Sequence, residues 1–205
     1  MVAIVDYGVG NLFSLKSSLA YIGEEAVVTS EPKTLERAER IILPGVGAFA
    51  DAAEKLSGCG LDKTVKALAE AGKPLMGICL GMQLLFDKSF EFGETAGLGL
   101  VRGEVKPIEP VIPKDYKVPH IGWNALRFSE RGRADEIFKY IKDGDCVYFV
   151  HSFAATGCGE SLLASAEYGA ELTAAVRSGS VFGMQFHPEK SGDVGLKILK
   201  AFCEI

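Results

Sequence analysis

A chain of 205 residues is long enough for one domain with a sizeable core, and two independent domains would be unusual at this length. The net charge of −5 argues against nucleic acid or an anionic membrane surface as the main partner. No apolar run approaches the roughly 18 residues of a membrane span, and no signal peptide is evident, so we expect a cytoplasmic protein. Five cysteines without C-x-x-C pairs suggest neither a disulfide framework nor a zinc site.

The first half of the chain alternates short apolar strands with helical patterns. We expect strands at residues 1–5, 26–29, 40–43 and 74–78, and helices at 12–22, 32–39, 48–56, 61–71 and 80–86. Such alternation implies right-handed crossovers and a parallel sheet covered on both faces. In a doubly wound sheet of this kind, active sites lie at the carboxyl ends of the strands.

The second half is richer in glycine, proline and short β-rich runs. We expect antiparallel strands and loops over 97–128, strands at 146–150, 161–168, 172–177 and 181–186, and helices at 134–141 and 191–204. The sequence therefore predicts a single α/β domain over 1–205. Its sheet is doubly wound, mostly parallel and flavodoxin-like, with helices on both faces and an antiparallel extension in the second half.

A cysteine stands where a predicted strand passes directly into a predicted helix. Cys79 is bracketed by Gly77 and Gly81, which gives G-x-C-x-G, the pattern of a nucleophile elbow with sulfur in place of a serine hydroxyl. A Cβ at either glycine would collide with the neighbouring strand or helix. A thiol at a helix N-terminus is favoured as the thiolate. The alternative is a small buried hydrophobic residue, and the motif alone leaves both open.

A cysteine nucleophile needs a histidine base and a group that orients the imidazole. Of the three histidines, His120 and His151 have no carboxylate near them in sequence. His187 follows a predicted strand and precedes Pro188 and Glu189, so His187 and Glu189 project from one rigid turn. A histidine at a strand end can also be an ordinary surface residue, and only the combination with the cysteine elbow favours catalysis.

Two glycine-containing loops follow predicted strands of the first half. The loop Pro44-Gly45-Val46-Gly47 follows the strand next to the elbow strand, and its backbone N–H groups, with that of Leu80, are candidate oxyanion donors. Its alternative is an ordinary strand-to-helix turn. The loop at 6–11 fails as a dinucleotide fingerprint, because Phe13 stands where the third glycine is required. We expect a structural or substrate-contacting loop there, with Asn11 as a helix N-cap.

Motifs along almost the whole chain resemble one known family. They lie at 6–15, 43–49, 77–86, 97–105, 119–124, 148–153 and 183–191. GICLGMQ and FHPE resemble motifs of the class I glutamine amidotransferases, whose glutaminase domain uses a Cys–His–Glu triad on an α/β sheet. DYGVGN, PGVG and PHIGWN are most similar to the branch that forms the glutaminase subunits of imidazole glycerol phosphate synthases in histidine biosynthesis.

The resemblance implies a role for several residues near the elbow. Cys79 would attack the side-chain amide of L-glutamine, His187 would carry the proton to the leaving ammonia, and Glu189 would orient His187. The family positions that contact substrate correspond to three further residues, which are Gln83, Glu91 and Ser152. The alternatives are an exposed helix residue for Gln83 and a solvated loop charge for Glu91. The sequence departs from the family pattern at Phe90, Phe92 and Phe153.

The resemblance also implies a partner and a mode of regulation. The partner is a synthase subunit with a (β/α)8 barrel fold, which forms a heterodimer with the glutaminase and consumes its ammonia. Family interface positions correspond to Trp123, Asn124, Tyr148 and Lys190. The free glutaminase is expected to be almost idle, with the 44–47 loop as the switch. No cofactor and no metal are expected.

Two other classes of function remain open from the residues alone. One is another elbow-cysteine enzyme of similar fold, such as a peptidase-like or deglycase-like hydrolase, although such proteins generally lack FHPE after a late strand. The other is a non-catalytic flavodoxin-like binding module, against which the complete set of triad residues argues.

Overall fold

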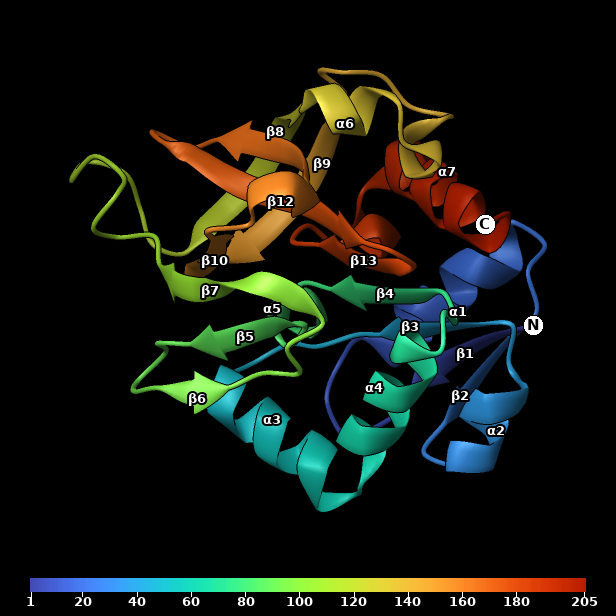
Figure 1. Cartoon of the computed structure of the whole chain (residues 1–205). Helices are drawn as coiled ribbons and strands as arrows, with labels where there is room; N and C mark the ends of the chain where they lie inside the picture. The colour runs from blue at the N-terminus through green and yellow to red at the C-terminus, as the bar shows by residue number, and fades with distance from the viewer.

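The computed structural model describes all of residues 1–205, and a nine-stranded mixed sheet forms its centre (Figure 1). Its parallel half consists of β2 (Ala26–Thr29), β1 (Val2–Val5), β3 (Arg40–Leu43), β4 (Leu75–Ile78) and β13 (Val181–Met184). Its antiparallel half continues with β12 (Glu171–Ser178), β11 (Leu162–Glu167), β8 (His120–Phe128) and β9 (Cys146–His151). The strand order is β2-β1-β3-β4-β13-β12-β11-β8-β9, which confirms the predicted parallel sheet with an antiparallel extension.

Helices cover both faces of the parallel strands because those strands are apolar on both sides. On β1, Val2 and Ile4 belong to one core cluster, whereas Ala3 and Val5 belong to the other. The first cluster is covered by α1 (Leu12–Tyr21) and α7 (Gly192–Cys203), and the second by α2 (Pro32–Arg37), α3 (Phe49–Gly58) and α4 (Leu61–Glu70). None of the helices is long and apolar enough to span a lipid bilayer.

A second, smaller sheet was not predicted from the sequence. It has the order β10-β7-β5-β6 and consists of β10 (Phe153–Thr156), β7 (Val101–Pro107), β5 (Phe86–Ser89) and β6 (Thr95–Ala96). The predicted helix over 80–86 is wrong beyond its first turn: α5 covers only Leu80–Gln83, and Phe86 already begins β5. The cause is competition for backbone partners, because the N–H groups of Leu98 and Val101 bond the carbonyls of Leu84 and Leu85.

The predicted helix at 134–141 is also wrong in extent. The chain instead forms α6 (Glu130–Arg133) and a separate 3-10 turn, η1 (Glu136–Phe138). Two side-chain caps divide the segment: Ser129 accepts from the N–H of Gly132, and Asp135 accepts from the N–H of Ile137. Two further 3-10 turns are η2 (Gly159–Ser161) and η3 (Pro188–Lys190), the second of which follows β13 at the candidate site.

Candidate active site

Cys79 lies at a strained turn between β4 and α5, as the elbow pattern predicts. Its φ of 53° is positive, a conformation that non-glycine residues adopt rarely and at a cost of about 1–3 kcal/mol. The turn is held by a hydrogen bond of 2.7 Å from the N–H of Cys79 to the carbonyl of Met184 on neighbouring β13. The strained backbone therefore presents the thiol at the carboxyl end of the parallel sheet, next to the start of α5.

The two flanking glycines are required by close backbone approaches. A Cβ on Gly81 would lie 1.9 Å from the carbonyl oxygen of Leu43, and a Cβ on Gly77 would lie 2.6 Å from the carbonyl oxygen of Gly81. Both separations are below any real van der Waals contact. The predicted collision of a side chain with the neighbouring elements is therefore confirmed, and the glycines allow α5 to pack directly on β3 and β4.

His187 and Glu189 lie on the turn that follows β13. Nδ1 of His187 is 2.8 Å from Oε1 of Glu189, and both side chains are almost fully buried. Because a carboxylate only accepts, this bond places a hydrogen on Nδ1 and directs Nε2 to the other side of the ring. Nε2 is buried and has no hydrogen-bond partner. The tautomer is thus the one that a general base facing a thiol requires.

The charge state of His187 reflects its two neighbours. Burial alone lowers the pKa of its imidazole, but the Cys79 sulfur and the Glu189 carboxylate outweigh burial and raise the pKa to about 9. The Cys79 thiol lies 3.8 Å from the carbonyl oxygen of Val150, and no hydrogen bond of ordinary geometry joins it to Nε2. The proximity of the sulfur and of the carboxylate favours the protonated imidazole of His187.

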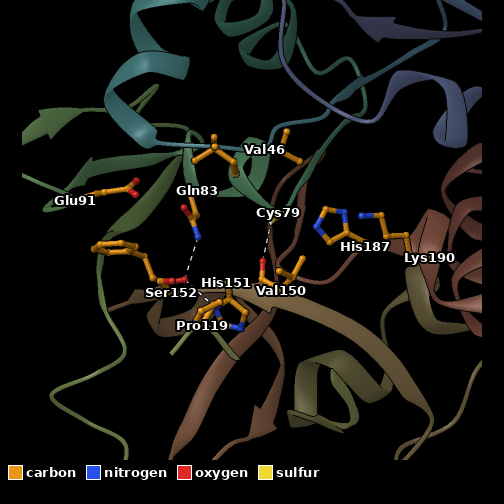
Figure 2. A pocket seen from close by; sticks show the side chains of 13 residues that line it. Val46, Cys79, Gln83, Glu91, Pro119, Val150, His151, Ser152, His187 and Lys190 are labelled. Atoms are coloured by element: carbon orange, nitrogen blue, oxygen red, sulfur yellow. Dashed lines mark hydrogen bonds between the residues drawn. The ribbon is translucent and has the colours of Figure 1, made fainter. Parts of the chain in front are cut away.

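A cavity of about 380 Å³ opens in front of the thiol (Figure 2). Its lining brings together residues from six separate segments of the chain: Val46, Gly47, Cys79, Leu80, Gln83, Glu91, Pro119, Val150, His151, Ser152, Phe153, His187 and Lys190. Figure 2 shows the labelled side chains converging on this space. The cavity is large enough for an amino acid of the size of glutamine, and it contains most of the predicted site residues.

One of the candidate oxyanion donors, the N–H of Leu80, is not free in this structure. The N–H of Leu80 donates to the carbonyl of Gly45 at 3.3 Å, so a loop carbonyl faces the position that an oxyanion would take. The loop is held from behind by Tyr7, a buried residue that sequence analysis missed, whose hydroxyl donates to the carbonyl of Pro44 at 2.7 Å. Burial raises the pKa of the Tyr7 phenol well above its ordinary value. The N–H of Leu80 is thus not available to another acceptor while the loop keeps this conformation.

The three candidate substrate residues all line the cavity, but two of them have partners already. Gln83 is 5% exposed, which excludes the exposed helix residue considered above, and its Nε2 donates at 3.0 Å to the carbonyl of Phe153 and at 3.0 Å to Oε1 of Gln185. Glu91 accepts from the N–H of Phe49 at 2.7 Å and so caps the start of α3. Neither residue is simply solvated.

The candidate interface residues lie beside the cavity on β8, β9 and η3. Trp123 is 55% exposed and packs edge-on against its cross-strand neighbour Tyr148, with ring centroids 5.9 Å apart. The carbonyl of Tyr148 accepts from the N–H of His187 at 3.0 Å, which joins this surface to the triad turn. Lys190 is exposed and lines the cavity mouth. An exposed Trp packed against a half-buried Tyr is typical of an interaction surface.

Comparison with known proteins agrees with this site. Residues 3–204 match the family model described as glutamine amidotransferase class-I. The chain is 48% identical to the imidazole glycerol phosphate synthase subunit HisH of Caldanaerobacter subterraneus subsp. tengcongensis, over 100% of this chain and 98% of that protein. It is also 48% identical to the HisH subunit of Wolinella succinogenes, over 100% of both chains.

Solved structures support the fold. A crystal structure of glutamine amidotransferase superposes with a TM-score of 0.75 at 22% identity, over 99% of this chain and 100% of that one. PurLQS from Thermotoga maritima gives a TM-score of 0.72 at 22% identity, over 99% of this chain and 97% of that one. The chain therefore belongs to the class I glutamine amidotransferases, among the HisH subunits of imidazole glycerol phosphate synthase.

Proposed function

We propose that Cys79, His187 and Glu189 are the catalytic triad with which this glutaminase subunit hydrolyses L-glutamine, and that residues 1–205 act as one amidotransferase domain. The observation that carries this proposal is the cavity in which a thiol on a strained elbow and the unpartnered Nε2 of His187 meet, with Glu189 bonded to Nδ1. These positions are the ones that a nucleophile, a base and an orienting group require.

The reaction follows from these positions. The Cys79 thiolate attacks the side-chain amide carbon, and the tetrahedral intermediate collapses when Nε2 of His187 gives its proton to the leaving nitrogen, which departs as ammonia. Water then attacks the thioester while His187 takes one of its protons, and glutamate leaves as the thiolate is restored. Glu189 stabilises the imidazolium at each stage.

The 44–47 loop controls whether the intermediate is stabilised. Because the Gly45 carbonyl occupies the N–H of Leu80, the peptide between Gly45 and Val46 has to rotate so that an N–H replaces the carbonyl. Gly47 has a φ of 99°, and glycine is the residue that makes such changes at low cost. The chain as described is thus an inactive form, which fits an enzyme that works only with its partner.

The HisH relatives are named as subunits of a synthase, which implies a complex with a synthase subunit. We infer that this partner is a (β/α)8 barrel that forms a heterodimer through Trp123, Asn124, Tyr148 and Lys190. Ammonia passes to the partner, which makes imidazole glycerol phosphate and aminoimidazole carboxamide ribonucleotide, and the complex works in the cytoplasm. Release of glutamate from glutamine, measured with and without the synthase subunit, tests the proposal. Absence of stimulated hydrolysis would contradict it.

Glu189→Gln is expected to lower the pKa of His187 from about 9 and to reduce stimulated turnover by about 10²-fold or more, because the imidazolium loses its negative partner. The pKa of His187 in the folded chain lies above its ordinary 6.5. Its charge therefore contributes stability that is complete below pH 6.5 and is lost as the pH rises towards 9. Imidazole chemical shifts measured against pH report the change, with the exposed Asp193→Asn as control. An unchanged His187 titration would exclude the role of Glu189.

Gly47→Ala is expected to reduce stimulated turnover by about tenfold, because an alanine at a φ of 99° is strained and alters the balance between the two loop forms. A Cβ on Gly47 meets no atom within 4 Å, whereas one on Gly45 would lie 2.7 Å from the N atom of Gly81. Substitution of Gly47 therefore tests the backbone conformation without adding a steric clash. Gly144→Ala is the matched control, since Gly144 has a φ of 95°, equally open space and no part in the cavity. Full turnover with unchanged stimulation in Gly47→Ala would rule out the loop rotation.

A further inference from the structure

Two histidines outside the proposed triad form a buried pair, of which His151 lines the cavity. His120 on β8 and His151 at the end of β9 are direct cross-strand neighbours, and they are only 1% and 6% exposed. Nδ1 of His120 lies 3.0 Å from Nε2 of His151. Each ring has one further nitrogen, and because the site is buried both of those atoms need partners within the protein.

Hydrogen-bond acceptors stand at both outer ends of the pair. Nδ1 of His151 is 2.8 Å from the carbonyl oxygen of Phe153. Nε2 of His120 is 2.7 Å from Oδ1 of Asn124. The orientation of that amide is set by its other end, since Nδ2 of Asn124 donates to the carbonyl of Glu167 at 2.9 Å. Both outer ring nitrogens therefore have to carry a hydrogen.

The contact between the two rings needs a third hydrogen. Three hydrogen bonds require three protons on the four ring nitrogens, whereas two neutral imidazoles carry only two. The geometry in the structure is thus that of a pair with one extra proton and a single positive charge. When that proton leaves, one of the three buried contacts of His120 and His151 loses its hydrogen, and a buried polar atom is left unsatisfied.

Aromatic faces enclose the charged pair. The ring of His120 lies between those of Phe149 and Tyr168, with centroid separations of 5.0 Å and 4.0 Å and interplanar angles of 19° and 20°. Such faces favour a cation over a neutral ring. The hydroxyl of Tyr168 points away, donating to the carbonyl of Lys117. No carboxylate forms an ion pair with either histidine.

Burial and neighbouring positive charge disfavour the protonated form of the histidine pair. Burial lowers the pKa of His120 and of His151, the latter to about 4, and repulsion from His120 and then from His187 adds to the effect on His151. The Cys79 thiol also lies on the cavity side, 3.8 Å from the carbonyl oxygen of Val150 next to His151. A positive charge on His187 opposes the charged pair. The three hydrogen bonds therefore stabilise the protonated form of the pair against burial and repulsion. Loss of any one of them would lower the affinity of the pair for its extra proton.

The pair is connected to the proposed nucleophile by further hydrogen bonds. The carbonyl of Phe153, which accepts from His151, also accepts from Nε2 of Gln83 at 3.0 Å. Gln83 donates in turn to Oε1 of Gln185, and Nε2 of Gln185 lies 3.8 Å from the sulfur of Cys79. Figure 2 shows Gln83, His151 and Cys79 around the cavity. One continuous chain of hydrogen bonds thus joins Asn124 on β8 to the cavity wall.

We propose that His120 and His151 are positioning residues that share one extra proton and hold the Phe153 carbonyl, and through it Gln83, in the form that binds substrate. The proposal rests on the proposed glutaminase function for its effect on substrate, but the shared proton itself does not depend on that function. A partner that contacts Asn124 acts directly on one end of the chain, so the pair also offers a route from the β8 surface to the cavity.

Nuclear magnetic resonance of the isolated chain with 15N-labelled histidine tests the shared proton, because the chain has only three histidines. We expect three ring hydrogens on His120 and His151 at the low-pH end of the folded range. As the pH rises, one proton should leave in a single step seen at both rings. Independent titration of the two rings, or two ring hydrogens at every pH at which the chain is folded, would overturn the proposal.

Two variants distinguish an effect of the shared proton from an effect of side-chain packing alone. In His120→Asn, the side-chain amide donates to Nε2 of His151 without an extra proton, so the shared step should disappear while the signal of His151 keeps its Nδ1 hydrogen. In Tyr168→Phe, the stacked ring remains and only the hydroxyl is lost, so the shared step should persist. Persistence of the step in His120→Asn would overturn the assignment.

The positioning role has its own readout in the complex with the synthase subunit. In the unmodified enzyme, the KM for glutamine should rise by about fivefold as the pH passes through the titration step shared by His120 and His151, which corresponds to the loss of one hydrogen bond. The pH dependence of kcat should instead reflect the titration of His187. The KM of His120→Asn should not change over the same pH range. A pH-independent KM in the unmodified enzyme would overturn the positioning role. An enzyme without glutaminase activity would overturn the proposed function instead and leave the resonance result standing.

Discussion

Replacing Cys79 with alanine is expected to reduce stimulated glutamine turnover by about 10⁴-fold or more, because the triad cannot form a thioester without its sulfur. The substitution leaves the backbone strain in place, since alanine at a φ of 53° is as constrained as cysteine. It also removes the Cys79 sulfur, which raises the pKa of His187, so that pKa should fall from about 9. Glutamate release with the synthase subunit bound measures the first effect, and imidazole shifts measure the second.

The chain provides a matched control in its own cysteines. Cys59 is exposed and lies at the end of α3, so Cys59→Ala should retain full turnover and an unchanged His187 titration. A glutamine-like electrophile should label Cys79 alone among the five cysteines. Full turnover in Cys79→Ala, or labelling of other cysteines at a comparable rate, would refute the assignment of the nucleophile.

The chemistry of the site was predictable where its residues are close in sequence. Cys79 between two glycines and His187 two residues before Glu189 are local patterns, and each has a mechanical reason that the structure bears out: a positive φ, prohibited Cβ positions and a 2.8 Å hydrogen bond. The topology that brings the two patterns together also follows from sequence, because the carboxyl ends of neighbouring parallel strands meet at one edge of a sheet.

The parts that sequence could not supply depend on long-range pairing. His120 and His151 are 31 residues apart, and only the register of β8 with β9 makes them neighbours. The hydrogen bond from Tyr7 to the carbonyl of Pro44 is a similar case, with the partners 37 positions apart in the sequence. The apolar sequence that continues past Gln83 is compatible with either a helix or a buried strand. The structure ends the helix there, because the carbonyls of Leu84 and Leu85 accept hydrogen bonds from residues distant in sequence.

Gly81→Ala is expected to lower the free energy of unfolding by more than about 3 kcal/mol, a large part of the stability of an ordinary domain. Its Cβ would lie 1.9 Å from the carbonyl oxygen and 2.8 Å from the carbonyl carbon of Leu43, which are backbone atoms of a central strand and cannot move aside alone. Either α5 has to leave the sheet or β3 has to shift, and both changes displace the elbow. Urea unfolding followed by circular dichroism measures the loss, and soluble yield reports it if the variant does not fold.

Gly58→Ala is the control that isolates the clash from the general effect of replacing glycine. Gly58 ends α3, is exposed, and would present a Cβ to open space. Alanine there should stabilise the chain by up to about 1 kcal/mol, because it restricts the unfolded state and favours the helix. Equal unfolding midpoints for Gly81→Ala and Gly58→Ala would show that α5 does not pack against β3 as described. A selective loss in Gly81→Ala would mean that the fold itself depends on the same glycine that shapes the nucleophile elbow.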